Sequence, residues 1–117
     1  EEKRKGILSQ QNEKLTNEIE RRQACEKEVA FQAKYDTLTN LPNRSYGSDR
    51  LALYLIRASR SRSKVLVMFI DLDHFKQIND SMGHFVGDEI LKLSAQRLYQ
   101  VARKTDLLAR IGGDEFL

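Results

Sequence analysis

The chain has 117 residues and a formal net charge of +3 at pH 7, a length that suits one domain or a domain with an appendage. So mild a positive charge does not favour nucleic-acid binding, and the single cysteine excludes an internal disulfide framework and fits a reducing cytoplasm. No run of about 18 apolar residues is present, so the sequence predicts no membrane span in this segment, while a membrane anchor upstream stays open.

Residues 1–35 are rich in charged side chains and predict one long helix. Two series of positions repeat along it every seven residues: Leu8, Leu15, Arg22 and Val29, and Asn12, Ile19, Glu26 and Ala33. This heptad seam predicts a parallel homodimer, weakened by three polar interruptions. The alternative is a solvated single helix held by Glu–Lys pairs. Because the chain begins without an initiating methionine, we expect it to belong to a longer protein.

The sequence YDTLTNLPNR, from Tyr35 to Arg44, breaks the helical pattern. Asp, Thr and Asn side chains compete for backbone hydrogen bonds, and Pro42 blocks helix continuation. We therefore predict a joint between a coil at residues 1–35 and a globular domain at residues 36–117. Asn43 is a plausible N-cap for the next helix.

That next helix places Leu51, Tyr54, Leu55 and Ala58 on one face. The helical pattern ends in a basic tract at residues 57–64. This tract lacks interleaved aromatic residues, so we interpret it as a solvated helix end. Six apolar residues at positions 65–70 then predict a buried strand.

Acidic residues follow this strand at once, and the chain continues with two helical patterns up to Arg103. Residues 106–111 predict a short strand, and Gly112 with Gly113 predicts the turn of a β-hairpin whose second strand begins with DEFL. The sequence therefore predicts an α/β fold with helices packed on a sheet.

Several polar residues of this region point together to a metal and a nucleotide. Asp71 at a strand end and Asp114 at the hairpin tip could meet across adjacent strands, as oxygen ligands of Mg²⁺. Lys76 can neutralise phosphate charge. Asn79 and Asp88 are left to bind a base edge, and an aspartate accepts from the amino and imino hydrogens of guanine.

Three stretches closely resemble the GGDEF domain of bacterial diguanylate cyclases: DTLTNLPNR at 36–44, DLDHFKQINDSMGHFVGDE at 71–89 and RKTDLLARIGGDEF at 103–116. The preceding helix resembles the signalling coil that joins such domains to an upstream sensor. The chain departs from the family at Asn40, where glycine is more frequent. Family members also continue well past the GGDEF motif. The resemblance implies a nucleotide-cyclase-like sheet flanked by helices, incomplete after the hairpin, and we expect these residues alone to be inactive.

The resemblance implies condensation of two GTP into cyclic di-GMP and pyrophosphate, in the bacterial cytoplasm, across a dimer of GGDEF domains. It assigns Mg²⁺ (or Mn²⁺) to Asp71, the Leu72 carbonyl and Asp114. It implies that Asn79, His84 and Asp88 contact the guanosine and that Lys76 stabilises the phosphate. Asp114 is also placed to help remove the hydroxyl proton.

Arg103 and Asp106 form an RxxD motif at the spacing of the family's inhibitory product site. This implies feedback by cyclic di-GMP, although Arg103 could merely meet the helix dipole and Asp106 could merely open a strand. Two alternatives from other classes stay open. One is a non-catalytic GTP-binding module that regulates an attached domain, and the other is a dimerisation coil with a passive α/β cap.

Overall fold

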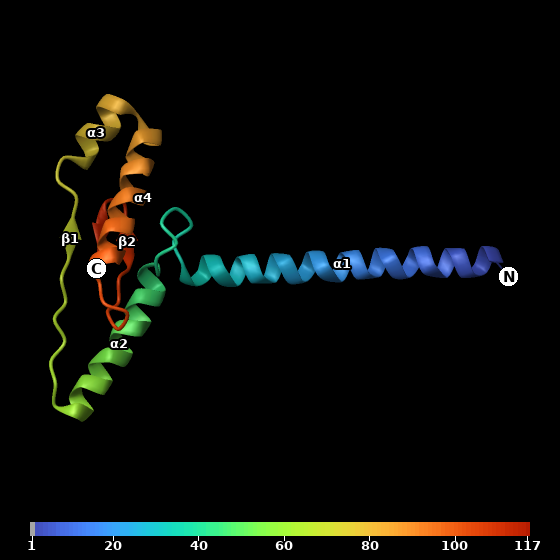
Figure 1. The fold of residues 1–117 in the computed structure, drawn as a ribbon, viewed down its shortest axis with the longest axis horizontal. Coiled ribbons are helices and arrows are strands. Elements are labelled where there is room, and N and C mark those ends of the chain that lie inside the picture. Colours follow the sequence, from blue (N-terminus) through green and yellow to red (C-terminus); the bar gives the residue numbers. More distant parts are fainter. Residues whose placement is uncertain (1) are drawn as a thin grey trace. The chain divides into compact units, whose positions relative to one another are not determined.

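The computed structural model describes residues 2–117, which form helices and a small antiparallel sheet (Figure 1). The elements are α1 (Glu2–Lys34), α2 (Arg44–Ser61), β1 (Ile70–Asp71), α3 (Phe75–Met82), α4 (His84–Val101), β2 (Arg110–Gly112) and β3 (Glu115–Phe116). They divide into two compact units, one up to Gln32 and one from Ala33 to Leu117. The mixed helix-and-sheet fold class is therefore confirmed, whereas the division into domains at residues 35 and 36 stays a prediction.

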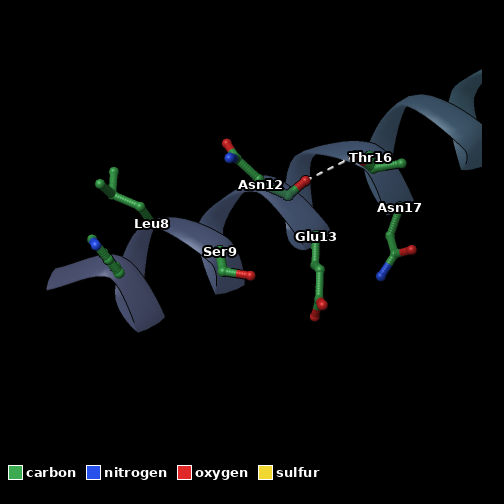
Figure 2. Close-up of a pocket in the computed structure, with 7 residues that line it drawn as sticks. Leu8, Ser9, Asn12, Glu13, Thr16 and Asn17 are labelled. Atoms are coloured by element: carbon green, nitrogen blue, oxygen red, sulfur yellow. Dashed lines mark hydrogen bonds between the residues drawn. The ribbon is translucent and has the colours of Figure 1, made fainter. Parts of the chain in front are cut away.

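The predicted N-terminal helix is confirmed as α1, and its side chains from Lys3 to Lys34 are all exposed. Figure 2 shows Leu8 and Asn12, one from each heptad series, on one side of the helix, with Ser9 and Glu13 on another. The Thr16 hydroxyl donates a 2.9 Å hydrogen bond to the Asn12 carbonyl. The shallow hollow drawn there is lined by α1 alone, so it is an open helix surface. No helix that the structure describes has the length and apolar character needed to cross a membrane.

The joint between α1 and α2 is a closed turn held by its own backbone. The amide of Asp36 donates to the Leu41 carbonyl at 2.7 Å, and the amide of Asn40 donates to the Asp36 carbonyl at 2.8 Å. Asn40 has a left-handed backbone with φ of 59°, a conformation in which asparagine is tolerated and glycine has no steric cost. Asn43 caps α2 as predicted, because its Oδ1 accepts from the Tyr46 amide at 2.9 Å.

The three strands are antiparallel in the order β1-β3-β2. Ile70 pairs with Phe116 and Asp71 pairs with Glu115. The predicted hairpin is confirmed as β2 and β3, and its turn contains Gly113 with φ of 52°. This register brings the end of β1 beside the turn of the hairpin.

The prediction of a buried strand over residues 65–70 is wrong in extent. Only Ile70 and Asp71 are in a strand, and Leu66 and Phe69 are 83% and 78% exposed. The sheet register accounts for the difference: β1 pairs with β3 only at Ile70 and Asp71, and no strand among residues 2–117 pairs with residues 65–68. Without a neighbouring strand, these residues run extended and unpaired.

The hydrophobic core lies between α4 and the sheet. Leu91 and Ala95 of α4 pack with Leu41 of the joint and with Phe116, which is fully buried on β3. Burial of a phenylalanine side chain contributes about 1.5 to 3 kcal/mol. α3 packs on α4, and α2 packs on β2. These contacts fix the ends of β1, β3 and the two central helices relative to one another.

Candidate metal and nucleotide site

Asp71 and Asp114 meet where β1 leaves the sheet. The amide of Leu72 donates to the Asp114 carbonyl at 3.2 Å, which ties the hairpin turn to the end of β1. The neighbouring Asp114 carboxyl, within hydrogen-bonding reach, raises the pKa of Asp71, with further contributions from desolvation and from the charges of Asp114, Glu115 and Asp73. The end of β1 and the hairpin turn therefore bring the carboxyl groups of Asp71 and Asp114 close together, with Asp71 exposed to solvent.

This carboxylate pair fits a divalent cation. The neighbouring negative charge disfavours ionisation of Asp71, and a cation placed beside the pair removes this repulsion. Magnesium binds proteins through one or two carboxylates and takes its remaining oxygens from water and substrate phosphates. Among residues 2–117 no group of three or more His, Cys, Asp or Glu side chains is arranged to hold a metal.

Asn79, His84 and Asp88 come from the packed pair α3 and α4. His84 opens α4, and Asp88 lies one turn later on the same helix face. The Asn79 Oδ1 atom is buried against Gly87 without a hydrogen-bond partner among the described residues. The helix packing thus brings Asn79 to the turn of α4 that separates His84 from Asp88. Buried amide oxygens normally accept a hydrogen bond, so the unpaired Oδ1 of Asn79 marks this place as a candidate for ligand contact.

Lys76 lies in the first turn of α3 and is exposed. The N-cap residue of α3, His74, has φ of 61° and makes no side-chain capping hydrogen bond. The N-terminus of α3 therefore combines the ammonium group of Lys76 with backbone amides that the His74 side chain does not cap. Amides at a helix N-terminus favour anions.

Arg103 and Asp106 form a tight turn after α4. The amide of Arg103 donates to Asp106 Oδ2 at 2.9 Å, and the amide of Asp106 donates to the Arg103 carbonyl at 3.0 Å. One oxygen of Asp106 thus has a local structural role. Both residues also line a hollow of about 550 Å³ whose wall includes Tyr46, Tyr54 and Tyr99.

Sequence reasoning missed Arg110 and its partner Asp36. Arg110 Nη1 donates to both carboxylate oxygens of Asp36, at 2.9 and 3.1 Å. Burial opposes ionisation of Asp36, but hydrogen bonds from the Thr39 hydroxyl, the Thr39 amide and Arg110 outweigh it, so the pKa of Asp36 is lowered. Since the folded pKa is the lower one, these hydrogen bonds to the Asp36 carboxylate stabilise the fold at neutral pH, and this contribution is lost as pH falls below the ordinary value of 3.8. The two residues are 74 positions apart, and no local pattern joins them.

Known proteins resemble this chain over the part that carries these residues. The family described as "Diguanylate cyclase, GGDEF domain" matches residues 33–117. Diguanylate cyclase TpbB of Pseudomonas aeruginosa is 49% identical over 88 residues, which cover 75% of this chain and 20% of that protein. Cyclic di-GMP phosphodiesterase NbdA of the same species is 40% identical over 102 residues, which cover 87% of this chain and 13% of that protein.

Solved structures agree with the sequence relatives. The coiled coil and GGDEF domain of DgcB from Caulobacter crescentus, in complex with c-di-GMP, is 32% identical, with a TM-score of 0.68. That match covers 93% of this chain and 57% of the DgcB chain. The chain spans about a fifth of the TpbB protein that it matches. It belongs to the GGDEF family of diguanylate cyclases.

Proposed function

We propose that the full-length protein containing this chain condenses two GTP molecules into cyclic di-GMP and releases two pyrophosphates. The observation that carries this proposal is the meeting of Asp71 and Asp114 at the hairpin turn of a GGDEF domain. Each of the two bonds forms when a 3′-hydroxyl oxygen attacks an α-phosphorus and pyrophosphate leaves. One domain holds one GTP, so two domains must face each other.

We assign Asp71, Asp114 and the Leu72 carbonyl as ligands of Mg²⁺ or Mn²⁺. When bound, such an ion supplies Lewis-acid stabilisation of the negative charge on the phosphates. Lys76 and the first-turn amides of α3 neutralise and orient the phosphates. We also assign Asp114 as the group that accepts the proton of the attacking hydroxyl.

We assign Asn79, His84 and Asp88 to the guanosine. The Asp88 carboxylate can accept from the two adjacent N–H donors of guanine, a donor pair that adenine lacks. The unpaired Asn79 Oδ1 atom adds a hydrogen-bond acceptor in the same place. Selectivity for GTP over ATP follows from this pairing, because a buried polar group left without its partner costs about 1 to 3 kcal/mol.

Gly87 makes room for Asn79, and its replacement tests this part of the site. A Cβ at position 87 would overlap the Asn79 Oδ1, so Gly87→Ala should displace that side chain. We expect the affinity for GTP to fall by about tenfold, the effect of losing one good hydrogen bond. Isothermal titration with 3′-deoxy-GTP, which cannot condense, measures it. Gly6→Ala is the matched control, because nothing lies within 4 Å of its added Cβ. Unchanged affinity in Gly87→Ala would remove Asn79 from the guanosine site.

The N-terminal helix has a role in this proposal. A parallel coiled coil between two copies of α1 would keep two GGDEF domains at high local concentration. The coiled-coil and GGDEF structure of DgcB shares this arrangement of helix and domain along the chain. We place the reaction in the cytoplasm, in keeping with the single free cysteine, Cys25.

The second candidate function is a GTP-binding module without catalysis. The relative NbdA favours this candidate. NbdA matches 87% of this chain, yet its name states phosphodiesterase activity and no cyclase activity. Incubation of the full-length protein with GTP or with ATP separates the two functions. Cyclic di-GMP formed from GTP alone supports the cyclase. Saturable binding of GTP without any product would support the regulatory module instead.

Feedback by the product is the third part of the proposal. Arg103 can bind a guanine edge or a phosphate, Asp106 retains one carboxylate oxygen for guanine donors, and the tyrosines of the adjacent hollow offer stacking surfaces. Arg103→Ala with Asp106→Ala should abolish inhibition by cyclic di-GMP while initial turnover stays within about twofold, because neither residue touches the carboxylate pair. The inhibition curve measures this. An unchanged curve would leave the RxxD motif with only its structural role in the turn.

Residues 1–117 on their own should make no cyclic di-GMP. Leu66, Met68 and Phe69 are exposed, and residues 65–68 have no strand partner among residues 2–117, so the sheet edge beside the site is unsupported. We expect the purified segment to form aggregates or exchanged dimers in light scattering. Measurable turnover by a well-folded 1–117 segment would refute this expectation.

A further inference from the structure

Arg110 holds the hairpin turn from one side. This residue opens β2, and its guanidinium donates from Nε and Nη2 to the carbonyl of Gly113, at 3.0 and 2.8 Å. The same guanidinium reaches Asp36 with Nη1. Three of its nitrogen positions are therefore engaged, in the fork geometry that only an arginine side chain provides.

The carbonyl that Arg110 holds belongs to the peptide group between Gly113 and Asp114. Gly113 has φ of 52°, so the turn has a defined left-handed step directly before Asp114. The next peptide group is also held, because the Asp114 carbonyl accepts from the Leu72 amide at 3.2 Å. Both peptide groups that flank Asp114 are thus fixed by hydrogen bonds, and these two bonds set where its side chain leaves the backbone.

Asp36 fixes Arg110 in turn. Besides Arg110, the carboxylate of Asp36 accepts from the amide and the hydroxyl of Thr39, at 2.9 and 2.7 Å. The side chains of Arg110 and Asp36 are only 14% and 20% exposed, so solvent screens this ion pair little. The Arg110 amide also donates to the Pro42 carbonyl at 3.0 Å. The turn between α1 and α2 is therefore a rigid anchor for the guanidinium.

We propose that Arg110, anchored by Asp36, is a positioning residue that sets the orientation of Asp114 as a metal ligand. This rests on the proposed function, since it presupposes a cation between Asp71 and Asp114. Groups that hydrogen-bond around a metal ligand fix its orientation, and their replacement typically costs about 10- to 100-fold in metal affinity. A lysine cannot substitute here, because one ammonium group cannot span Asp36 and two bonds to Gly113.

The test measures Mn²⁺ binding by the full-length protein in the presence of 3′-deoxy-GTP, using the electron paramagnetic resonance signal of free Mn²⁺. Arg110→Gln and Arg110→Lys are expected to weaken Mn²⁺ binding by about 10- to 100-fold, and Asp36→Asn by less. The double variant Asp36→Asn with Arg110→Gln should be no weaker than Arg110→Gln alone, because Asp36 acts only through Arg110. Arg97→Gln, on the exposed side of α4, is the control and should bind like the wild type.

Three results would overturn the proposal: wild-type Mn²⁺ affinity in a folded Arg110→Gln protein, restoration of affinity by lysine, or additive effects of Asp36 and Arg110. If Arg110→Gln fails to fold, as thermal unfolding shows, Asp36→Asn carries the test, and its unchanged affinity overturns the proposal. Failure of the proposed function looks different. In that case the wild-type protein itself binds no Mn²⁺ with 3′-deoxy-GTP and forms no product from GTP.

Discussion

Asp71→Asn and Asp114→Asn, each alone, are expected to abolish synthesis of cyclic di-GMP by the full-length protein. Each replacement removes a carboxylate from the pair at the end of β1 and the hairpin turn. The loss of turnover should exceed the roughly 10- to 100-fold that follows when only an outer partner of a metal ligand is changed. Chromatographic measurement of product from GTP gives the result. Near-normal turnover in either variant would show that the pair is not the metal site.

These variants should nevertheless remain folded. The pKa of Asp71 is raised by its neighbour, so without metal the ionisation of Asp71 lowers stability as pH rises from 3.8 through the raised pKa. An asparagine removes this repulsion, so at neutral pH the metal-free variants should unfold at the same temperature as the wild type or higher. Asp49→Asn, an exposed acid on α2, is the matched control and should change neither turnover nor stability. A variant that unfolds would assign Asp71 or Asp114 a structural role.

Leu15→Asp with Ile19→Asp is expected to convert a dimer into a monomer. Both side chains are exposed on α1, at 55% and 53%, and belong to the heptad seam, where a carboxylate would be buried in a paired helix. In the proposed function two domains must meet for each bond, so turnover at low protein concentration should fall by about a hundredfold or more. Sedimentation velocity and product formation measure the two effects.

The control for this variant places the same charges away from the seam. Asn17→Asp with Ala24→Asp adds two carboxylates to the opposite side of α1, at positions two residues after Leu15 and Arg22. That protein should stay dimeric and active. A wild-type protein that is monomeric at high micromolar concentration would contradict the coiled-coil prediction, and α1 would then be a solvated single helix.

Local chemistry explains which parts of the fold could be predicted from the sequence. The Asn43 cap depends on a side chain and an amide three residues apart, and the hairpin depends on two adjacent glycines. Both were confirmed. The approach of Asp71 to Asp114 could also be expected. Asp71 directly follows the apolar run at 65–70, and Asp114 directly follows the two glycines of the hairpin turn. The roles of these carboxylates, and of Lys76, Asn79 and Asp88, stay predictions.

Other features that depend on distant partners could not be predicted, because no local pattern selects the partner. The apolar run at 65–70 indicated a buried strand, but burial requires a neighbouring strand, and the register leaves most of that run without one. The pairing of Arg110 with Asp36 joins residues 74 positions apart, among several arginines and aspartates that look alike in sequence. The packing of Asn79 on Gly87 depends in the same way on the crossing of α3 and α4.

The most direct measurement of the central claim is the balance of products from GTP. The full-length protein is incubated with Mg²⁺ and GTP, and cyclic di-GMP and pyrophosphate are quantified in the same samples over time. We predict two pyrophosphates for each cyclic di-GMP, with no product from ATP and none from the Asp114→Asn protein. Consumption of GTP to GDP and phosphate, or binding of GTP without consumption, would contradict the assignment of this chain to a diguanylate cyclase.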